Sequence, residues 1–279
     1  MNHTAVIVDS TSYMPNGWAA HEHITVVPVQ VIVAGQAYDE TDVEDASFVT
    51  AALGEWKPVT TSRPSPERFQ SACEERIAAG ADGIVIATLS ADLSATYESA
   101  LLAAREVNVP VRVVDSRSIA MGLGFAAVAG AQSAASGGDV DEVAAVIAKR
   151  ASGASVLFYV DTLEYLRRGG RMSSAKAAVG QALSVKPILE LVDGHVVQLD
   201  KVRTATKALG RIVELAVQRA AGADVEIAVQ HLGAPQRATE VSQALASRIP
   251  GALIVQCPIG GVVGAHVGPG MVAVIVSPK

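Results

Sequence analysis

The first half of the chain alternates short apolar runs with amphipathic segments, which predicts β-strands and α-helices in turn. Apolar runs predict strands at 5–8, 24–33, 83–87 and 111–114, and Pro28 can divide the second into two pieces. A helix is predicted to begin at Pro66, with Ser65 as its N-cap, and to stop at Gly80. Further helices are expected at 96–106, 122–135 and 140–151.

The pattern changes after about residue 152. A strand at 156–160 precedes a short helix, where Asp161 and Glu164 resemble a capping box and Gly169-Gly170 marks the end. Apolar runs joined by Asp193-Gly194 predict a β-hairpin. The remaining expected elements are the two hairpin strands at 187–192 and 195–199, helices at 206–221 and 235–248, and strands at 225–230, 252–256 and 271–276. A glycine-rich loop is expected between the last two strands.

These patterns predict an α/β protein with two domains. Residues 1–152 are expected to form a parallel, doubly wound sheet, because strands and helices alternate there. Residues 153–279 are expected to form a mixed α/β sheet, because a hairpin interrupts the alternation. The first domain would supply the ligand-binding loops at its strand ends, and the second would carry a basic segment and the loop around His266.

Composition narrows the class of protein. Half of the 279 residues are apolar and 18% are charged, so the chain can bury a substantial core, and disorder is excluded. The net charge of −6 argues against binding nucleic acid or an anionic membrane. The uncharged stretch 119–138 is rich in small residues and is predicted to be a buried helix rather than a membrane span.

The same features predict a cytoplasmic location. No basic segment or cleavage site precedes the first apolar run, so no signal peptide is expected. Cys73 and Cys257 lie far apart in the sequence and have no metal-ligand spacing. We interpret them as reduced core thiols, with a single structural disulfide as the alternative.

Hydroxyl side chains recur at the ends of the predicted strands. Thr88 and Ser90 follow one strand, and Ser10, Thr11 and Ser12 follow another. A third group, Thr60-Thr61-Ser62, comes just before the helix that Ser65 caps. The carboxyl ends of parallel strands form a ligand crevice, so these hydroxyls suit a small anion. The alternative is that each one only caps a helix.

His266 stands among five glycines between Gly260 and Gly270, which lets backbone approach a ligand closely. A structural histidine is the alternative. His21 and His23 lack further ligands, and no metal site is predicted. Residues 167–211 carry a local charge of +6. One interpretation is that the arginines up to Arg171 are solvated and complement the dipole of a helix C-terminus. The other is a basic patch near Arg203 that binds an acidic or phosphate-bearing partner.

Enzyme signatures are weak. The glycines at 122 and 124 resemble a dinucleotide-binding turn but lie seven residues beyond their strand and lack the acidic partner. There is no nucleophile elbow and no Walker lysine loop. No catalytic residue and no cofactor are therefore predicted.

Several motifs together resemble the DegV family, the bacterial fatty-acid-binding proteins that serve as lipid carriers for fatty acid kinase. The resemblance spans essentially the whole chain. Its motifs are Val8-Asp9-Ser10-Thr11, Thr60-Thr61-Ser62-Arg63-Pro64-Ser65, Leu89-Ser90-Ala91-Asp92-Leu93-Ser94-Ala95-Thr96-Tyr97, Val114-Asp115-Ser116, Gly169-Gly170-Arg171-Met172-Ser173, Lys186-Pro187-Ile188-Leu189, Val202-Arg203-Thr204 and Gly264-Ala265-His266-Val267-Gly268-Pro269-Gly270.

The resemblance implies an acyl chain, such as palmitate or oleate, buried in a tunnel at the sheet edge. It implies that Thr61, Ser62 and Ser94 meet the carboxylate with His266 close by, and that Arg171 and Arg203 contact phosphate or a docked kinase. Where the family often has Ser-Ser and Gly, this chain has Ser90-Ala91 and Ala95. How much Ser90 contributes to carboxylate binding is therefore left open.

Energetics favour a carrier. Burial contributes about 0.8 kcal/mol per methylene, so about fourteen methylenes contribute on the order of 11 kcal/mol before binding costs. A buried carboxylate needs several hydrogen-bond donors. The leading hypothesis is a non-catalytic fatty-acid-binding subunit. The alternatives are a small-molecule enzyme related to dihydroxyacetone kinase, in which His266 would hold the substrate covalently, and a lipid-sensing regulatory module.

Overall fold

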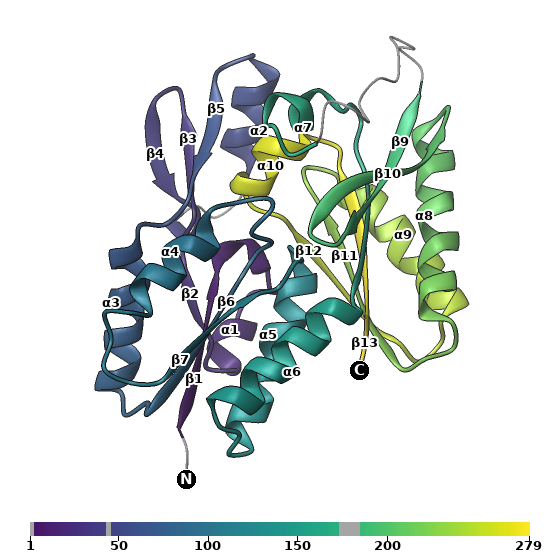
Figure 1. Cartoon of the computed structure of the whole chain (residues 1–279). Helices are drawn as coiled ribbons and strands as arrows, with labels where there is room; N and C mark the ends of the chain where they lie inside the picture. The colour runs from purple at the N-terminus through teal and green to yellow at the C-terminus, as the bar shows by residue number, and fades with distance from the viewer. Residues whose placement is uncertain (1–2, 43–45, 173–184) are drawn as a thin grey trace. The chain divides into compact units, whose positions relative to one another are not determined.

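The computed structural model describes residues 3–42, 46–172 and 185–279. The chain forms two compact units, each with its own sheets and hydrophobic core (Figure 1). The first unit comprises Met1–Gln30 and Ser62–Gly153, and the second comprises Val31–Thr61 and Ala154–Lys279.

The first unit contains a parallel sheet of four strands in the order β2-β1-β6-β7. The strands are β1 (Thr4–Asp9), β2 (Thr25–Val27), β6 (Gly83–Thr88) and β7 (Val111–Asp115). Every residue of β1 and β6 is buried, because helices cover both faces of a parallel sheet. The predicted parallel sheet is confirmed.

Alternate side chains of β1 point to opposite faces, and each face has its own helices (Figure 1). Ala5 and Ile7 belong to the core that α3 and α4 complete, while Val6 and Val8 belong to the core of α5 and α6. The helices of this unit are α1 (Trp18–His21), α3 (Pro66–Ala78), α4 (Thr96–Ala103), α5 (Met121–Ala135) and α6 (Val140–Gly153), with a 3-10 turn η1 (Ser10–Ser12).

The uncharged stretch forms α5, a close-packed helix. Gly130 lies so near α6 that an added Cβ would fall 2.4 Å from Ile147 Cγ1. Within the described residues, no helix is both long and apolar enough to cross a membrane.

The second unit contains a mixed sheet of six strands in the order β10-β9-β8-β13-β11-β12. Its strands are β8 (Ser155–Tyr159), β9 (Lys186–Val192), β10 (His195–Val202), β11 (Val225–His231), β12 (Leu253–Pro258) and β13 (Val272–Pro278). Helices α8 (Ala205–Ala220) and α9 (Pro235–Arg248) pack on it through a shared apolar core. Asp193 and Gly194, with φ of 49° and 82°, form the predicted hairpin turn.

Residues 31–61 group with the second unit, whereas the sequence pattern assigned them to the first domain. They form a three-stranded sheet in the order β4-β3-β5, a 3-10 turn and a helix. These elements are β3 (Gln30–Val33), β4 (Gln36–Asp39), η2 (Glu40–Asp42), α2 (Ser47–Gly54) and β5 (Val59–Ser62). The physical reason is packing: Val31 and Val49 lie against Gly261, and Glu40 Oε1 accepts from Val262 N at 2.8 Å.

Two local predictions are corrected. The expected glycine-rich loop contains a helix, α10 (Gly261–Val267), whose first turn is capped by the Glu40 carboxylate. The short helix is present as α7 (Glu164–Arg168), but its N-cap residue is Leu163 and Asp161 does not cap it. Instead, Thr162 Oγ1 accepts from Glu164 N at 3.2 Å, and the Asp161 carboxylate binds other residues.

Cys73 and Cys257 are both buried, and neither forms a disulfide within the described residues. Burial raises the pKa of each thiol to about 11. Both are therefore protonated at neutral pH and pack as apolar side chains.

Candidate ligand-binding site

A hydroxyl and an imidazole meet in the second unit. Thr61, on β5, places its Oγ1 2.9 Å from Nε2 of His266, on α10. Both side chains are half-buried. The structure therefore brings together two of the residues that the sequence predicted for the site.

His266 is uncharged at neutral pH. Burial, together with the nearby positive charge of Arg171, lowers the pKa of its imidazole to about 4. Nδ1 is buried and has no hydrogen-bond partner among the described residues. One ring nitrogen therefore carries a proton and the other does not, and only Nε2 faces Thr61.

The pair opens on a pocket of about 370 Å³, within the size range of small-molecule sites. Its wall combines apolar side chains, threonine hydroxyls and cationic groups, as suits an amphiphilic anion. The lining residues are Leu53, Trp56, Lys57, Pro58, Val59, Thr60, Thr61, Tyr165, Arg168, Gly169, Arg171, Ala265 and His266.

Glycine allows the histidine ring to lie against α7. A Cβ on Gly169, the residue after α7, would fall 2.2 Å from His266 Nδ1. A second glycine, Gly268, follows α10 with a φ of +75°, and a Cβ there would fall 2.1 Å from the Tyr165 ring. The segment that carries α7 and the end of α10 thus approach each other closely at two points, and each point requires glycine.

Cations border the pocket. Arg171 is half-buried and donates from Nη1 to Gly169 O at 2.5 Å. Arg168 pairs with Glu164 at 2.7 Å and lies over the ring of Trp56, 5.2 Å from its centroid. Trp56 is 73% exposed and is the largest exposed apolar side chain in the described part of the chain.

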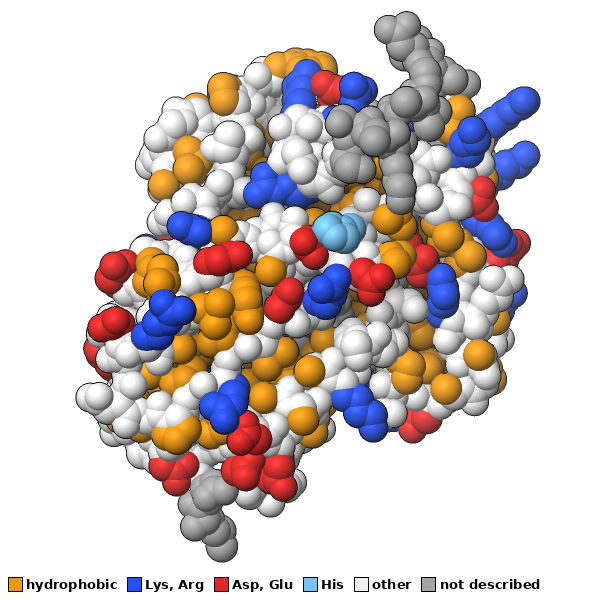
Figure 2. Space-filling model, in the orientation of Figure 1, with side chains coloured by type: hydrophobic (Ala, Val, Ile, Leu, Met, Phe, Trp, Pro, Cys, Tyr) orange, Lys and Arg blue, Asp and Glu red, His pale blue; other side chains and the backbone are white. Residues whose placement is uncertain are grey.

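Arg203, the other predicted arginine, does not line this pocket. It is exposed on the strand-to-helix connection between β10 and α8. Figure 2 shows basic side chains gathered over β10 and α8, in the upper right of that view. Ser173 and Lys176, which belong to the same basic segment of the sequence, lie outside the described residues.

The other serines that were predicted to meet the carboxylate belong to the first unit. Ser62 is half-buried, and its Oγ donates to Arg63 O over 3.4 Å. Ser94 Oγ lies 2.9 Å from Thr96 Oγ1 at the start of α4. Ser90 is fully buried, and its Oγ accepts from Asp92 N at 3.3 Å. The geometry of Ser90 indicates that its hydroxyl holds the loop after β6 in shape.

Asp9 is an organising residue of the first unit that the sequence did not single out for a role of its own. Its carboxylate is fully buried and accepts from Thr11 N at 2.9 Å and from Leu89 N at 2.7 Å. Burial raises the pKa of Asp9, and these hydrogen bonds oppose the rise. Asp9 thereby ties the loop after β1 to the loop after β6. Its place in a strand-end Asp-Ser-Thr motif is the signal that could have found it.

Across residues 3–42, 46–172 and 185–279, no group of histidine, cysteine, aspartate and glutamate side chains could hold a metal ion. The site in the second unit combines neutral donors with arginine charge, which is chemistry suited to an organic anion.

The fold and the pocket define a two-unit α/β protein with a hydroxyl–imidazole pair in its second unit. Comparison with known proteins identifies the family. The family model described as "Uncharacterised protein, DegV family" matches residues 3–279. This chain belongs to the DegV family.

Relatives in this family cover nearly the full length of the chain. A DegV domain-containing protein of Streptomyces coelicolor is 49% identical over 278 residues, which is 99% of each chain. A solved structure described as "Fatty Acid Binding of a DegV family Protein from Thermus thermophilus" has a TM-score of 0.92 at 29% identity, over 99% of this chain and 100% of that one. DegV of Bacillus subtilis, described as a fatty acid binding protein, has a TM-score of 0.90 at 30% identity over 100% of both chains.

Proposed function

We propose that this protein binds a long-chain fatty acid and that Thr61, oriented by His266, donates a hydrogen bond to its carboxylate. The observation that carries the proposal is the 2.9 Å pair of Thr61 Oγ1 and His266 Nε2, set in a pocket beside Arg171. The two solved relatives described as fatty acid binding support the choice of ligand.

The pair can serve as a relay of hydrogen bonds. With its pKa near 4, His266 is neutral at pH 7 and can carry its proton on Nε2. Nε2–H then donates to Thr61 Oγ1, which leaves the hydroxyl hydrogen of Thr61 to donate to a carboxylate oxygen. Neutral donors hold the carboxylate without pairing it tightly, so its oxygens stay able to react.

A reactive, accessible carboxylate can be presented to another protein that modifies it. We propose that a separate fatty acid kinase uses ATP to convert the bound acid to an acyl phosphate, while this chain supplies no catalytic group and needs no cofactor. Arg171 would then face the incoming phosphate. Contacts from Ser62 and Ser94 to the carboxylate, and a docking role for Arg203, stay predictions from the family resemblance.

Lipid analysis of the purified protein tests the binding step. Denaturing mass spectrometry of protein purified without detergent is expected to release one fatty acid per chain, with palmitate or oleate as the first masses to examine. Delipidated protein should take up the same acid again. Protein that carries no acid and shows no thermal shift with palmitate or oleate would contradict the proposal.

Acyl phosphate formation tests the transfer step. Palmitate-loaded protein is incubated with ATP and a purified fatty acid kinase catalytic subunit, and acyl phosphate is trapped as the hydroxamate. Product is expected only when both proteins are present. Product from this chain and ATP alone would show that the chain is itself an enzyme.

A further inference from the structure

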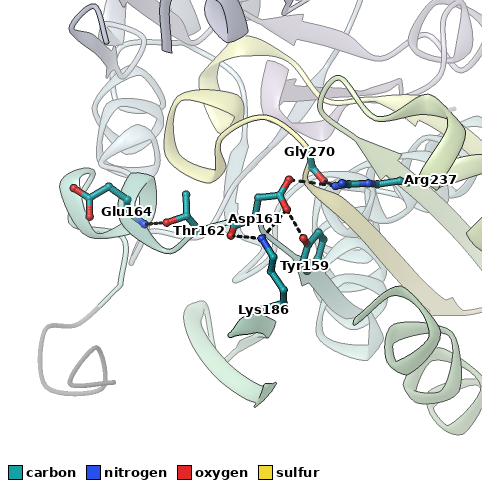
Figure 3. Close-up of polar contacts among 7 residues, drawn as sticks. All are labelled: Tyr159, Asp161, Thr162, Glu164, Lys186, Arg237 and Gly270. Carbon is teal, nitrogen blue, oxygen red and sulfur yellow. Dashed lines mark hydrogen bonds and ion pairs between the residues drawn. The ribbon is translucent and has the colours of Figure 1, made fainter. Parts of the chain in front are cut away.

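A cluster of polar side chains surrounds Asp161, which follows β8 in the second unit (Figure 3). Its carboxylate accepts from the Tyr159 hydroxyl, from Lys186 Nζ at 3.1 Å and from Arg237 Nη1 at 3.2 Å. Lys186 Nζ also donates to Asp161 O at 3.1 Å. One carboxylate therefore joins the ends of two strands to helix α9.

The cluster reaches the turn that follows α10. Arg237 Nη1 donates to Gly270 O at 3.0 Å as well as to Asp161 (Figure 3). Gly270 has a φ of +84°, and a Cβ there would fall 2.1 Å from Asp161 Oδ2. The carboxylate thus lies directly against the backbone of the turn, and only glycine allows this approach.

Three close contacts align this turn with the segment that runs from β8 through α7. Asp161 lies against Gly270, Tyr165 lies against Gly268, and Gly169 lies against His266. The residue numbers rise along one segment as they fall along the other, so the two segments run antiparallel. His266 occupies the last contact of the series, and Asp161 occupies the first.

We propose that Asp161 is a positioning residue for His266: its carboxylate, with Arg237 and Lys186, fixes the turn after α10 and so sets the imidazole against Gly169 and Thr61. The carboxylate is suited to this role because it is ionised. Burial alone would raise the pKa of Asp161, but hydrogen bonds from Tyr159, Lys186 and Arg237 outweigh burial and hold the pKa below its ordinary value.

The test is Asp161→Asn, which keeps the shape of the side chain and removes its charge. Asp200→Asn is the matched control, because Asp200 pairs with Arg211 at 3.0 Å in the same unit and touches neither the turn nor α7. The first readout is NMR titration of His266 in the lipid-free protein, with its signal assigned from a His266→Gln variant. The second readout is the rate at which loaded protein loses palmitate.

In Asp161→Asn, the pKa of His266 is expected to rise from about 4 toward its ordinary value, by about one unit, because a looser turn exposes the ring. Loss of a negative charge would by itself lower the pKa of a histidine, so a rise reports a change in packing. Palmitate should leave about tenfold faster, which corresponds to about 1.4 kcal/mol. Asp200→Asn should change neither readout.

An unchanged His266 titration in a folded Asp161→Asn protein would overturn the proposal. If that variant does not fold, Arg237→Lys takes its place, because it keeps the positive charge but loses the guanidinium that bonds both Gly270 O and the Asp161 carboxylate. The palmitate readout rests on the proposed function, whereas the titration needs no lipid. A protein that binds no fatty acid but shows the shifted titration would therefore refute the binding proposal and support the positioning role.

Discussion

Thr61 and His266 are separated by 205 positions in the chain, yet their side chains lie in hydrogen-bond contact. Neither local sequence predicts this contact: Thr61 lies near the end of a short strand, and His266 lies in a run of glycines that favoured a structural role when taken alone. A single hydrogen bond to a charged ligand typically contributes about 1.5–3 kcal/mol. Individual side chains of this pair should therefore have measurable and separable effects.

Thr61→Val tests the hydroxyl. Valine keeps the volume of threonine and cannot donate, so the affinity for palmitate is expected to fall at least about tenfold with little change in thermal stability. Equilibrium competition against a fluorescent fatty acid measures the change. The control is Thr239→Val on α9, whose hydroxyl binds Pro235 O at 3.0 Å and does not line the pocket. Equal affinities for the two variants would argue against a contact from Thr61.

The buried imidazole makes stability depend on pH. Its pKa is lowered to about 4 in the folded chain, whereas an unfolded histidine titrates near 6.5. Between these values the unfolded state binds a proton that the folded state excludes, so stability rises with pH and is fully present above about 6.5. The difference amounts to at most about 3 kcal/mol.

His266→Gln should remove this contribution. Urea denaturation of both proteins between pH 4 and pH 7 is expected to show a shallower loss of stability for the variant as the pH falls. Burial also lowers the pKa of His231, but that residue is the same in both proteins, so the comparison isolates His266. Parallel curves would mean that His266 is readily protonated in the folded state.

At the scale of elements, the close approach of neighbouring side chains to the backbone explains the glycines around His266. The sequence predicted an irregular loop there because glycine is a poor helix former. Residues 261–267 nevertheless form α10, since small residues let the helix pack on Val49 and Leu232 and the Glu40 carboxylate caps its first turn. Glu40 lies 222 positions from Val262, a partner that no local pattern can reveal.

Gly268→Ala tests the contact between α7 and the turn. The substitution adds a Cβ that would fall 2.1 Å from the Tyr165 ring, on a backbone with a φ of +75°. Gly35→Ala is the matched control, since Gly35 has a φ of +86° and nothing within 4 Å of the added atom. A positive φ by itself costs an alanine about 1 kcal/mol, so Gly35→Ala should lose about that much. Gly268→Ala should lose at least about 1 kcal/mol more, because its φ of 75° and ψ of 167° suit only glycine and its Cβ meets the ring. Chemical denaturation measures the free energy of unfolding of both variants. Equal losses would show that the Tyr165 ring moves aside at no cost.

Sequence patterns predicted most elements but not every partner. Strands of the parallel sheet were identified because they are buried on both faces and read as continuous apolar runs. The sheet of β3, β4 and β5 was missed for two reasons. Gln36–Asp39 is short and half polar, and the apolar run through Pro28 is continuous although the chain leaves the first unit and enters the second within it. Asp161 was misinterpreted as a helix cap because its three side-chain partners come from β8, β9 and α9.

At the scale of the whole molecule, two units with separate cores belong to one chain, and a ligand stabilises the unit that binds it. A ligand that binds only the folded state adds about 2.7 kcal/mol when its concentration is 100 times Kd. For a domain of 150–250 residues, each kcal/mol raises Tm by about 2–4 °C. The proposed fatty acid site lies in the second unit, so the effect should appear in the unfolding of that unit.

Calorimetry of delipidated protein with palmitate is therefore expected to raise the transition of the second unit by about 5–10 °C at such saturation. Methyl palmitate is the matched ligand, because it keeps the acyl chain and removes the charged carboxylate. If Thr61 and His266 recognise the carboxylate, the ester should raise Tm markedly less than the acid does. In Thr61→Val, the difference between the Tm shifts of acid and ester should become smaller. Equal shifts from acid and ester would mean that the acyl chain alone accounts for binding, and the pair at Thr61 and His266 would then need another explanation.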